Sequence, residues 1–470
     1  MKRILLSLLA IMLVTISSFS QFPEDALRLS LSGPGIGARS LGLGMTYTGI
    51  ATDYTAAYWN PAGLAQIKRN EFSLGLSHFS YGNTSSFQGN SSSFTNSATN
   101  LNDVGLVYSF PTTQGSLVLA FGYGRSNDFT TGLSFSGDNP YSSMVPSLDY
   151  DLAYELYLVD SVGNTPIQDS VEQQGRVLED GGLNNWMISG AVEAAQNLFL
   201  GATLNFISGS YTYNRDFSEF DVYDKYTAAR FGADYAIDRW KVINTIDGDI
   251  SGFTMRLGML YKFNNRSRLG FNIKLPTSYT IREEYASEGT STFDVPDQQG
   301  NYSYYYRIPG ATEYDVTTPF VFSGGFSIGS DDLILASDVE YTDWTQMKFK
   351  GDPYLEQYNT DIKEIFTPTF NFHVGAEFHV PESSLRLRGG FAYIPSPYKD
   401  DPTDYDQKYV TGGLGVLMAD VLMLDLGFAH GFWETSHVNY QHYNNAGKPL
   451  SETKEKITTN NVMATISYRF

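Results

Sequence analysis

Apolar residues alternate with polar or small residues in segment after segment of this chain. In the last strand-like segment one face is apolar and the opposite face is polar: Val462, Ala464, Ile466, Tyr468 and Phe470 against Asn461, Thr465, Ser467 and Arg469. The same period of two recurs at 255–262, 268–274, 370–378, 385–393 and 422–428. This alternation predicts β-strands, with one face suited to lipid and the other to a wet lumen.

The links between these segments support a barrel over a soluble sandwich. We expect strands at about 71–80, 103–110, 116–124, 183–193, 198–208, 251–263, 267–281, 317–328, 332–342, 367–379, 385–394, 409–417, 421–432 and 460–470. Short links alternate strictly with long ones, which cover 81–102, 125–182, 209–250, 282–316, 343–366, 395–408 and 433–459. Short periplasmic turns and long extracellular loops are typical of bacterial barrels. The pattern therefore predicts an all-β fold, a transmembrane antiparallel β-barrel of about 14 strands over residues 71–470.

The start of the chain predicts export. Lys2 and Arg3 precede an apolar run from Ile4 to Ile16, and small residues follow it. This is the pattern of a secretory signal peptide over residues 1–20. The chain has no cysteine, so neither a disulfide nor a cysteine-linked lipid anchor is expected. No later apolar run is long enough for a membrane-spanning helix, and the net charge of -20 argues against nucleic acid as a partner.

Residues 21–70 fit no strand and carry the most distinctive motif of the chain. A glycine-rich stretch, Gly37-Ala38-Arg39-Ser40-Leu41-Gly42-Leu43-Gly44, is followed by Ala56-Ala57-Tyr58-Trp59-Asn60-Pro61-Ala62-Gly63-Leu64. About 50 irregular residues in front of a barrel predict a hatch that plugs its lumen. This stretch resembles the N-terminal hatch of the FadL/TodX family, outer-membrane channels for long-chain fatty acids and hydrocarbons. The resemblance continues at Leu275-Pro276-Thr277, at 341–344 and at 385–397.

The resemblance implies a transport mechanism. In the family, extracellular loops capture an apolar ligand, and a kinked strand opens a lateral gap towards the membrane. The hatch and lateral-gate residues that match here are Asn60, Pro61, Ala62 and Gly63. Gly122 and Gly124 in the third expected strand would supply a kink or bulge, or would only relieve crowding. The expected function is diffusional uptake of fatty acids or other hydrophobic compounds.

Several cations are expected to face the lumen. Arg256, Arg268, Lys274, Arg386 and Arg388 fall on the face opposite the apolar one. Buried charge is costly unless it is paired. We therefore expect most of them to pair with lumen carboxylates such as Glu377 and Asp425 or with the hatch, leaving one or two to receive a substrate carboxylate. The residues alone do not decide which.

Aromatic residues are concentrated in two long links. Link 209–250 contains Tyr211, Tyr213, Phe217, Phe220, Tyr223 and Phe231, and link 282–316 contains Tyr302, Tyr304, Tyr305 and Tyr306. The family places its first capture groove on the corresponding loops. The alternative is that these rings pack the loops together or form the usual interfacial girdle, and for any one ring packing is favoured.

Other chemistries have weaker support. No serine or base stands beside the histidines in the pattern of a catalytic triad, so no enzymatic activity and no cofactor are expected. His373, Glu377 and His379 share a strand face, but residues six positions apart in a strand are separated by about 20 Å, too far to share one metal ion. The acidic run 399–406 lacks the spacing of a calcium hand and fits a solvated loop.

The expected partners follow from this interpretation. They are a fatty acid or another hydrophobic small molecule, the lipids of the outer membrane, and the barrel assembly machinery, with the protein itself a monomer. Tyr468 and Phe470 would form the C-terminal assembly signal that other outer-membrane barrels carry. The competing hypothesis is a barrel of the same build that does not transport and instead serves as a docking or shuttle component of a secretion system. Both hypotheses place the protein in the bacterial outer membrane.

Overall fold

The computed structural model describes residues 23–232, 235–264 and 267–470. The signal peptide predicted over residues 1–20 lies outside these residues. Within the described part of the chain, no helix combines the length and the apolar character needed to cross a membrane.

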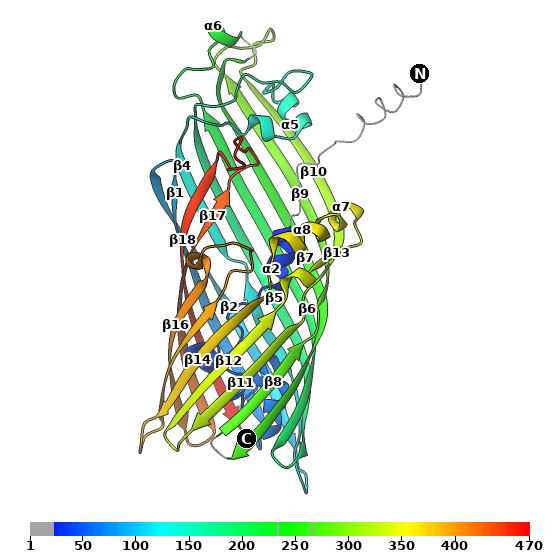
Figure 1. Ribbon diagram of the computed structural model, residues 1–470, viewed down its shortest axis with the longest axis vertical. Helices are drawn as coiled ribbons and strands as arrows, with labels where there is room; N and C mark the ends of the chain where they lie inside the picture. Colours follow the sequence, from blue (N-terminus) through cyan, green and yellow to red (C-terminus); the bar gives the residue numbers. More distant parts are fainter. Residues whose placement is uncertain (1–22, 233–234, 265–266) are drawn as a thin grey trace.

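One closed antiparallel sheet forms the wall of the molecule (Figure 1). Its 18 segments make 14 wall strands, because four pairs of successive segments continue one another, namely β3 with β4, β8 with β9, β10 with β11 and β12 with β13. Pairing of β1 with β18, from Glu71 opposite Arg469 to Ser86 opposite Lys454, closes the barrel. The predicted barrel and its strand number are therefore confirmed.

The bounds of the strands are as follows. They are β1 (Glu71–Phe87), β2 (Asn90–Phe110), β3 (Leu117–Asp128), β4 (Thr131–Asn139), β5 (Val171–Ala195), β6 (Leu198–Phe220), β7 (Ile237–Asn264), β8 (Ser267–Lys274) and β9 (Ser278–Phe293). The remainder are β10 (Ser303–Thr317), β11 (Val321–Gly329), β12 (Leu333–Thr342), β13 (Lys348–Lys350), β14 (Thr369–His379), β15 (Leu385–Ile394), β16 (Gln407–Met418), β17 (Leu422–Val438) and β18 (Glu452–Arg469).

Many wall strands are longer than predicted. The expected loop 81–102 is a hairpin of β1 and β2 that turns at Gln88 and Gly89, and much of 209–250 and 282–316 also belongs to strands. These bounds were wrong because the apolar alternation stops where a strand leaves the lipid, while the backbone pairing continues. Strands β12, β14, β15 and β16 have only 10 to 12 residues, so the wall is tall on one side and low on the other (Figure 1).

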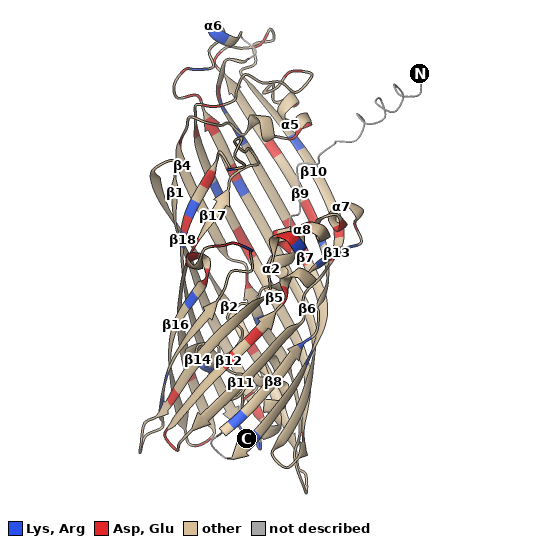
Figure 2. Cartoon of the chain, in the orientation of Figure 1, with Lys and Arg blue, Asp and Glu red and all other residues tan. Residues whose placement is uncertain are grey.

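An apolar belt surrounds the lower part of the barrel, next to the short turns. On β7, for example, Phe253, Leu257, Met259 and Tyr261 are exposed on the outer surface. Figure 2 shows charged positions along many strands of the upper extensions. The end with the short turns is therefore the periplasmic end, and the extended end is extracellular.

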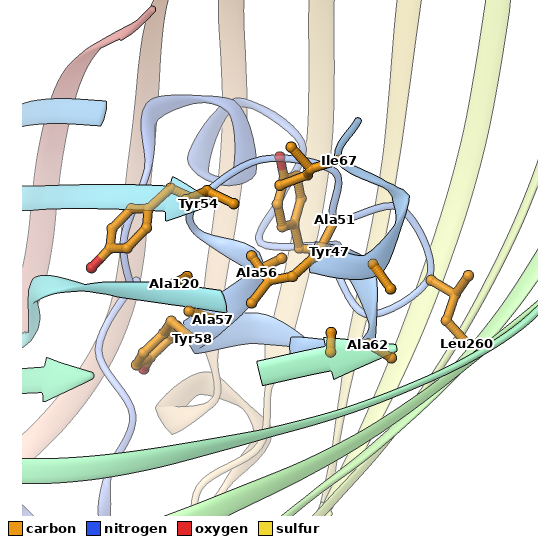
Figure 3. Close-up of a cluster of buried hydrophobic side chains, with 14 of the residues drawn as sticks. Tyr47, Ala51, Tyr54, Ala56, Ala57, Tyr58, Ala62, Ile67, Ala120 and Leu260 are labelled. Atoms are coloured by element: carbon orange, nitrogen blue, oxygen red, sulfur yellow. The ribbon is translucent and has the colours of Figure 1, made fainter. Parts of the chain in front are cut away.

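Residues 23–70, which we call the N-terminal segment, lie inside the lower and middle part of the barrel. The segment forms α2 (Pro23–Ser30), α3 (Ala38–Gly42), α4 (Ala56–Trp59) and η1 (Pro61–Gln66). Figure 3 shows its side chains packed against wall residues such as Ala120 of β3 and Leu260 of β7. Most of the segment from residue 34 onward is buried, so it fills this part of the lumen with a core of its own.

Above the N-terminal segment, two further groups of residues occupy the inside of the wall. The link between β13 and β14 folds inward as α7 (Pro353–Glu356) and α8 (Tyr358–Ile365), and Ile362 joins α2 in one apolar cluster. Higher still, α5 (Tyr150–Glu155) packs in a second cluster that includes Phe217 and Trp240. At its centre Glu219, 1% exposed, accepts hydrogen bonds from four groups, the side chains of Ser143, Gln173 and Trp240 and the backbone of Met144.

Candidate functional site

The Asn60-Pro61-Ala62 turn lies against β6, β7 and β8. The Asn60 amide donates to the carbonyl oxygens of Thr48, at 2.8 Å, and of Met259 on β7, at 3.2 Å, and its own oxygen accepts from Ala62 N–H. A Cβ atom at Gly258 would lie 2.2 Å from Asn60 Oδ1, and one at Gly201 would lie 2.4 Å from the Pro61 backbone. Glycine at these wall positions is therefore what lets the turn approach the strands.

Gly63, the last residue of the predicted gate motif, has a separate contact. A Cβ atom there would lie 2.4 Å from the Ala51 carbonyl oxygen, so the turn packs closely against an earlier part of the N-terminal segment. Between the tripeptide at β6 and the irregular third wall strand lies β5. Helix η1, which begins at Pro61 of the tripeptide, also contacts that strand, and the role of the tripeptide in a lateral gate remains a prediction.

Buried charges hold the N-terminal segment to the wall. Arg39 forms an ion pair with Glu377 of β14 at 2.9 Å, and Glu377, 1% exposed, also pairs with Arg388 of β15 at 2.7 Å. Arg388 in turn pairs with Asp425 of β17 at 2.6 Å. These alternating charges satisfy one another across three strands, so Arg388 is committed to structure and is not free for a ligand.

Two more carboxylates anchor the same segment. Asp338 of β12 accepts the backbone N–H groups of Tyr47 and Thr48, both at 2.7 Å, and Glu71 accepts Tyr54 N–H at 2.8 Å. Burial raises the pKa of Tyr47 well above its usual value, so the hydroxyl stays protonated and donates to Asp53. No pattern in the sequence identifies Asp338 as a backbone anchor, since its partners lie about 290 positions away.

Arg256 and Lys274 form a basic site above the tripeptide. They face each other across β7 and β8, and both line a cavity of about 20 Å³. The Arg256 guanidinium donates to Asn272 at 3.1 Å and lies 5.1 Å from the centre of the Tyr58 ring. Within the described residues, neither cation has a carboxylate at ion-pair distance.

A second cavity adjoins the first and shares Arg256, Tyr58 and residues 31–32 with it. Its volume is about 60 Å³, and Asp338, Glu340 and His373 contribute to its polar lining. Such a volume holds a few water molecules. A long acyl chain therefore cannot occupy either cavity unless residues 31–32, which line both, move.

Arg268 and Arg386 lie elsewhere. Each is the second residue of its strand, β8 and β15 respectively, at the periplasmic end of the barrel. Thr48 and Asn60 of the N-terminal segment contact the wall at Gly270, between Arg268 and Lys274. The five cations that the sequence grouped together are thus divided into an upper pair, a structural arginine and two periplasmic arginines.

The wall is interrupted between β2 and β3. Pairing of these strands runs from Phe110 opposite Leu117 only as far as Asp103 opposite Gly124. Beyond that point β2 pairs with β1 alone, β4 pairs with β5, and the register of β3 on β5 shifts between Arg125 and Asn127. We call this interruption the seam.

Gly122 and Gly124 lie just before the irregularity and are not its site, which corrects the expected kink position. A Cβ atom at Gly122 would lie 2.3 Å from the Tyr54 hydroxyl, and one at Gly124 would lie 3.0 Å from Ile36. Tyr54 donates a hydrogen bond to the Tyr123 carbonyl oxygen. The two glycines make room for the N-terminal segment, while the bulge itself follows at Arg125.

Residues 31–37 of the N-terminal segment cover the seam from inside. On the β2 side, Gly37 N–H donates to Asn102 Oδ1 at 2.9 Å, and on the β3 side Asn127 Nδ2 donates to the Leu31 carbonyl oxygen at 3.2 Å. Trp59 Nε1 donates to the Ile36 carbonyl oxygen at 3.0 Å. Trp59 precedes the tripeptide and therefore links it to the seam.

The aromatic residues of the long links are divided between packing and exposure. Tyr211 and Phe217 are buried in apolar clusters, and Tyr304 and Tyr306 pack against one. Tyr223, Tyr302 and Tyr305 are exposed. A capture groove on these links stays a prediction.

The C-terminal aromatic residues end the closing strand. Tyr468 and Phe470 are exposed, with their rings stacked at a centroid distance of 5.8 Å. Phe470 N–H donates to the Asn70 carbonyl oxygen at 3.0 Å, beside the start of β1. Their role as an assembly signal also stays a prediction.

The histidines and carboxylates of β14 have structural partners. His373 Nδ1 lies 3.0 Å from the Gly44 carbonyl oxygen, and His379 Nε2 lies 3.0 Å from Glu377. In the acidic run, Asp406 accepts Ser396 N–H at 2.9 Å and the Tyr393 hydroxyl. In the parts of the chain that are described, no group of three or more histidines and carboxylates is arranged to hold a metal ion.

Known structures share this architecture. The toluene transporter TodX of P. putida superposes with a TM-score of 0.58 over 93% of this chain and 99% of that one, at 14% sequence identity. A FadL homologue of Pseudomonas aeruginosa gives a TM-score of 0.56, with 94% and 99% of the two chains covered and 14% identity. At these identities the likeness shows the fold alone.

Sequence comparison adds the family. A 47 kDa outer membrane protein of Pasteurella multocida (strain Pm70) is 26% identical over 206 residues, which make up 40% of this chain and 45% of that protein, so the match spans less than half of the relative. The model of the family described as "Outer membrane protein transport protein (OMPP1/FadL/TodX)" matches residues 183–470. This match covers more than half of the chain, and the chain therefore belongs to the OMPP1/FadL/TodX family of outer-membrane transport proteins of Gram-negative bacteria.

Proposed function

We propose that this protein takes up amphipathic molecules with an anionic head and a long apolar tail, of the long-chain fatty acid class, by diffusion across the outer membrane. The single observation that carries the proposal is the pair Arg256 and Lys274, which lines a cavity and has no carboxylate partner within the described residues. Glu340 is the carboxylate that attracts both, and two adjacent cations without an ion-paired carboxylate favour the binding of an anion.

The charge of this pair favours an acid over a hydrocarbon. TodX is named as a toluene transporter, and toluene is uncharged. A route for such a molecule gains nothing from two cations, and their desolvation costs free energy. A carboxylate offsets that cost by accepting charge-assisted hydrogen bonds.

We further propose that the tail leaves through the seam. The floor of the lumen is held by the ion pairs of Arg39, Glu377 and Arg388, whereas residues 31–37 are held at the seam by neutral hydrogen bonds. Movement of these residues would enlarge both cavities and uncover the seam together. The Asn60-Pro61-Ala62 turn acts in this proposal through Trp59, which it positions against Ile36.

Uptake of a labelled long-chain acid by cells tests the proposal. The double variant Arg256→Gln with Lys274→Gln should lower the initial uptake rate by about tenfold or more, because each charged hydrogen bond contributes about 1.5–3 kcal/mol. The matched control is Arg282→Gln, an outward-facing arginine paired with Glu313. Unchanged uptake after deletion of the whole protein would refute the proposal.

Native mass spectrometry provides a second readout. Protein purified in detergent should carry an acyl lipid with a free carboxylate, and the double variant should carry less of it. Replacing Asn60 and Pro61 by alanine should lower uptake while the barrel still assembles, as judged by heat-modifiable migration in gels. A barrel that binds only neutral hydrocarbons would contradict the assignment of an acid.

One observation favours the alternative, a docking protein. The extracellular extension has a packed core of its own around Glu219, and Tyr150, Tyr154 and Tyr157 are exposed at its surface. A docking protein needs such an exposed surface and no internal route. Transport is supported if the Arg256 and Lys274 variant takes up less of the labelled acid while a variant with the three tyrosines replaced by serine takes up as much as the wild type.

A further inference from the structure

Lumen-facing cations gather at the periplasmic mouth of the barrel. Arg268 on β8 and Arg386 on β15 alternate with outward-facing residues such as Leu387, and Lys262 on β7 stands opposite Arg268 in the register. All three are partly buried. We call Lys262, Arg268 and Arg386 the mouth cations.

These cations have no counterion of their own. Glu377 lies between the two arginines along the wall, but its oxygens already accept from Arg39 and Arg388. Within the described residues, neither Arg268 nor Arg386 takes part in an ion pair or a side-chain hydrogen bond. Repulsion from Arg39 acts on both of them.

The charge of the whole chain makes this arrangement unusual. The sequence has 51 acidic and 31 basic residues, so carboxylates are in excess. Glu377 attracts both arginines and Glu193 attracts Lys262, yet within the described residues no carboxylate forms an ion pair with a mouth cation. Partly buried like charges without partners cost free energy. An anion that binds from outside the barrel would offset this free-energy cost.

The mouth cations are distinct from Arg256 and Lys274. The N-terminal segment contacts the wall at Gly258 and Gly270 and separates the two groups. A substrate held above the segment therefore does not reach the mouth cations, and an anion that binds there arrives from the periplasm.

The spacing of the cations indicates the size of the ligand. In the wall, β11, β12 and β14 lie between β8 and β15. Four steps of about 4.8 Å each place the backbones of Arg268 and Arg386 up to about 19 Å apart along the wall. One small anion contacts a single cation in such an arrangement, whereas a chain with several carboxylates contacts them all.

We propose that the periplasmic mouth is a docking site for an acidic polypeptide segment of a periplasmic protein, bound through Lys262, Arg268 and Arg386. The mouth cations supply charge complementarity to a ligand with several carboxylates. This interaction is independent of the transport route, because the N-terminal segment lies between them.

Binding of a fluorescent hexaglutamate peptide to the full-length protein in detergent, followed by anisotropy, tests the proposal. The peptide should bind the wild type, more weakly as salt rises. The double variant Arg268→Gln with Arg386→Gln should bind about tenfold more weakly or worse. The matched control is Arg282→Gln with Arg307→Gln, two extracellular arginines that are paired with glutamates and should leave binding unchanged.

Three outcomes would overturn the proposal. Equal peptide binding by the double variant would exclude the mouth cations, and inorganic phosphate that binds as tightly as the peptide would indicate a site for small anions only. Thermal unfolding in low salt guards against misfolding, since removing two cations that Arg39 repels should leave the unfolding midpoint unchanged or raise it. A lower midpoint would assign the arginines a structural role and would also contradict the proposal.

The two proposals fail separately. Uptake of the labelled acid by the Arg268 and Arg386 variant should equal that of the wild type, and peptide binding by the Arg256 and Lys274 variant should be unchanged. Reduced uptake in the Arg268 and Arg386 variant, or reduced peptide binding in the Arg256 and Lys274 variant, would show that the two groups of cations act as one site and would contradict the proposal of a separate docking site.

Discussion

The two halves of the N-terminal segment are held in the barrel by different forces. Residues 38–70 are fixed by buried charges, as in the Arg39–Glu377 ion pair and the Asp338 carboxylate that accepts two backbone N–H groups. Residues 31–37 meet the wall at the seam through the neutral amides of Asn102 and Asn127.

The difference separates a fixed part from one that can move. Breaking a buried ion pair exposes uncompensated charge in a medium of low polarity and costs several kcal/mol. A neutral hydrogen bond contributes only about 0.5–1.5 kcal/mol, and water can replace it. The residues that must move to enlarge the cavities are thus attached by the weaker contacts.

The largest expected effect is on the fixed part. Replacing Glu377 by alanine leaves Arg39 and Arg388 without their shared carboxylate, so we expect a loss of about 3–5 kcal/mol in the free energy of unfolding. Urea unfolding in detergent, followed by tryptophan fluorescence, measures it. His379→Gln is the control, since it removes only one neighbour of Glu377. Equal stability of the Glu377 variant and the wild type would remove the basis of the comparison.

A steric change at the wall should have the next largest effect. A Cβ atom at Gly105 would lie 2.0 Å from the Tyr54 ring, so Gly105→Val should lower the stability by about 1–3 kcal/mol. Gly389→Val is the matched control, because a Cβ atom there would lie an ordinary 3.9 Å from the Thr411 carbonyl oxygen. Adding Tyr54→Ala should restore part of the loss of the Gly105 variant, and no restoration would mean that the strain lies elsewhere.

Releasing the seam should affect stability less and mobility more. The variant Asn102→Ala with Asn127→Ala should lose about 1–2 kcal/mol and show faster amide hydrogen exchange at residues 31–37, with 38–70 unchanged. The control is Asn214→Ala, at an exposed position of β6. Faster exchange over the whole segment would show that the two halves move together.

The smallest effect on stability is expected at an exposed ion pair on the outer surface. Arg282 pairs with Glu313 at 2.7 Å on the outer surface, and both side chains are more than half exposed. Solvent and salt screen such a pair, so Arg282→Gln should leave the urea midpoint unchanged. A clear shift of the urea midpoint in the Arg282 variant would mean that exposed ion pairs contribute more to the stability of this barrel than their exposure indicates. The stability loss of the Glu377 variant would then no longer distinguish buried ion pairs from exposed ones.

Much of the barrel could be predicted from the sequence because its signal is local. Lipid on one face and water on the other impose a period of two on each strand, so 14 strands, their order and their orientation followed from alternation and link lengths. The same reasoning failed at 81–102 and in the other extensions, where both faces are polar and pairing continues without an apolar pattern.

The roles of the lumen cations could not be predicted in the same way. Arg39 and Glu377 are 338 positions apart and meet only because the N-terminal segment lies against β14. Arg388 has its partners on other wall strands, Glu377 of β14 and Asp425 of β17, whereas Arg256, Lys274, Arg268 and Arg386 have no carboxylate at ion-pair distance within the described residues.

The sequence by itself thus determined that the chain is an outer-membrane barrel with an irregular segment in front of it. Only the tertiary structure decided which cations are paired, that the seam lies beyond Gly124, and that residues 31–37 cover it. The physical reason is that strand patterning reports the solvent on each side of one strand, whereas ion pairing and closure depend on which distant backbones the wall glycines allow to approach.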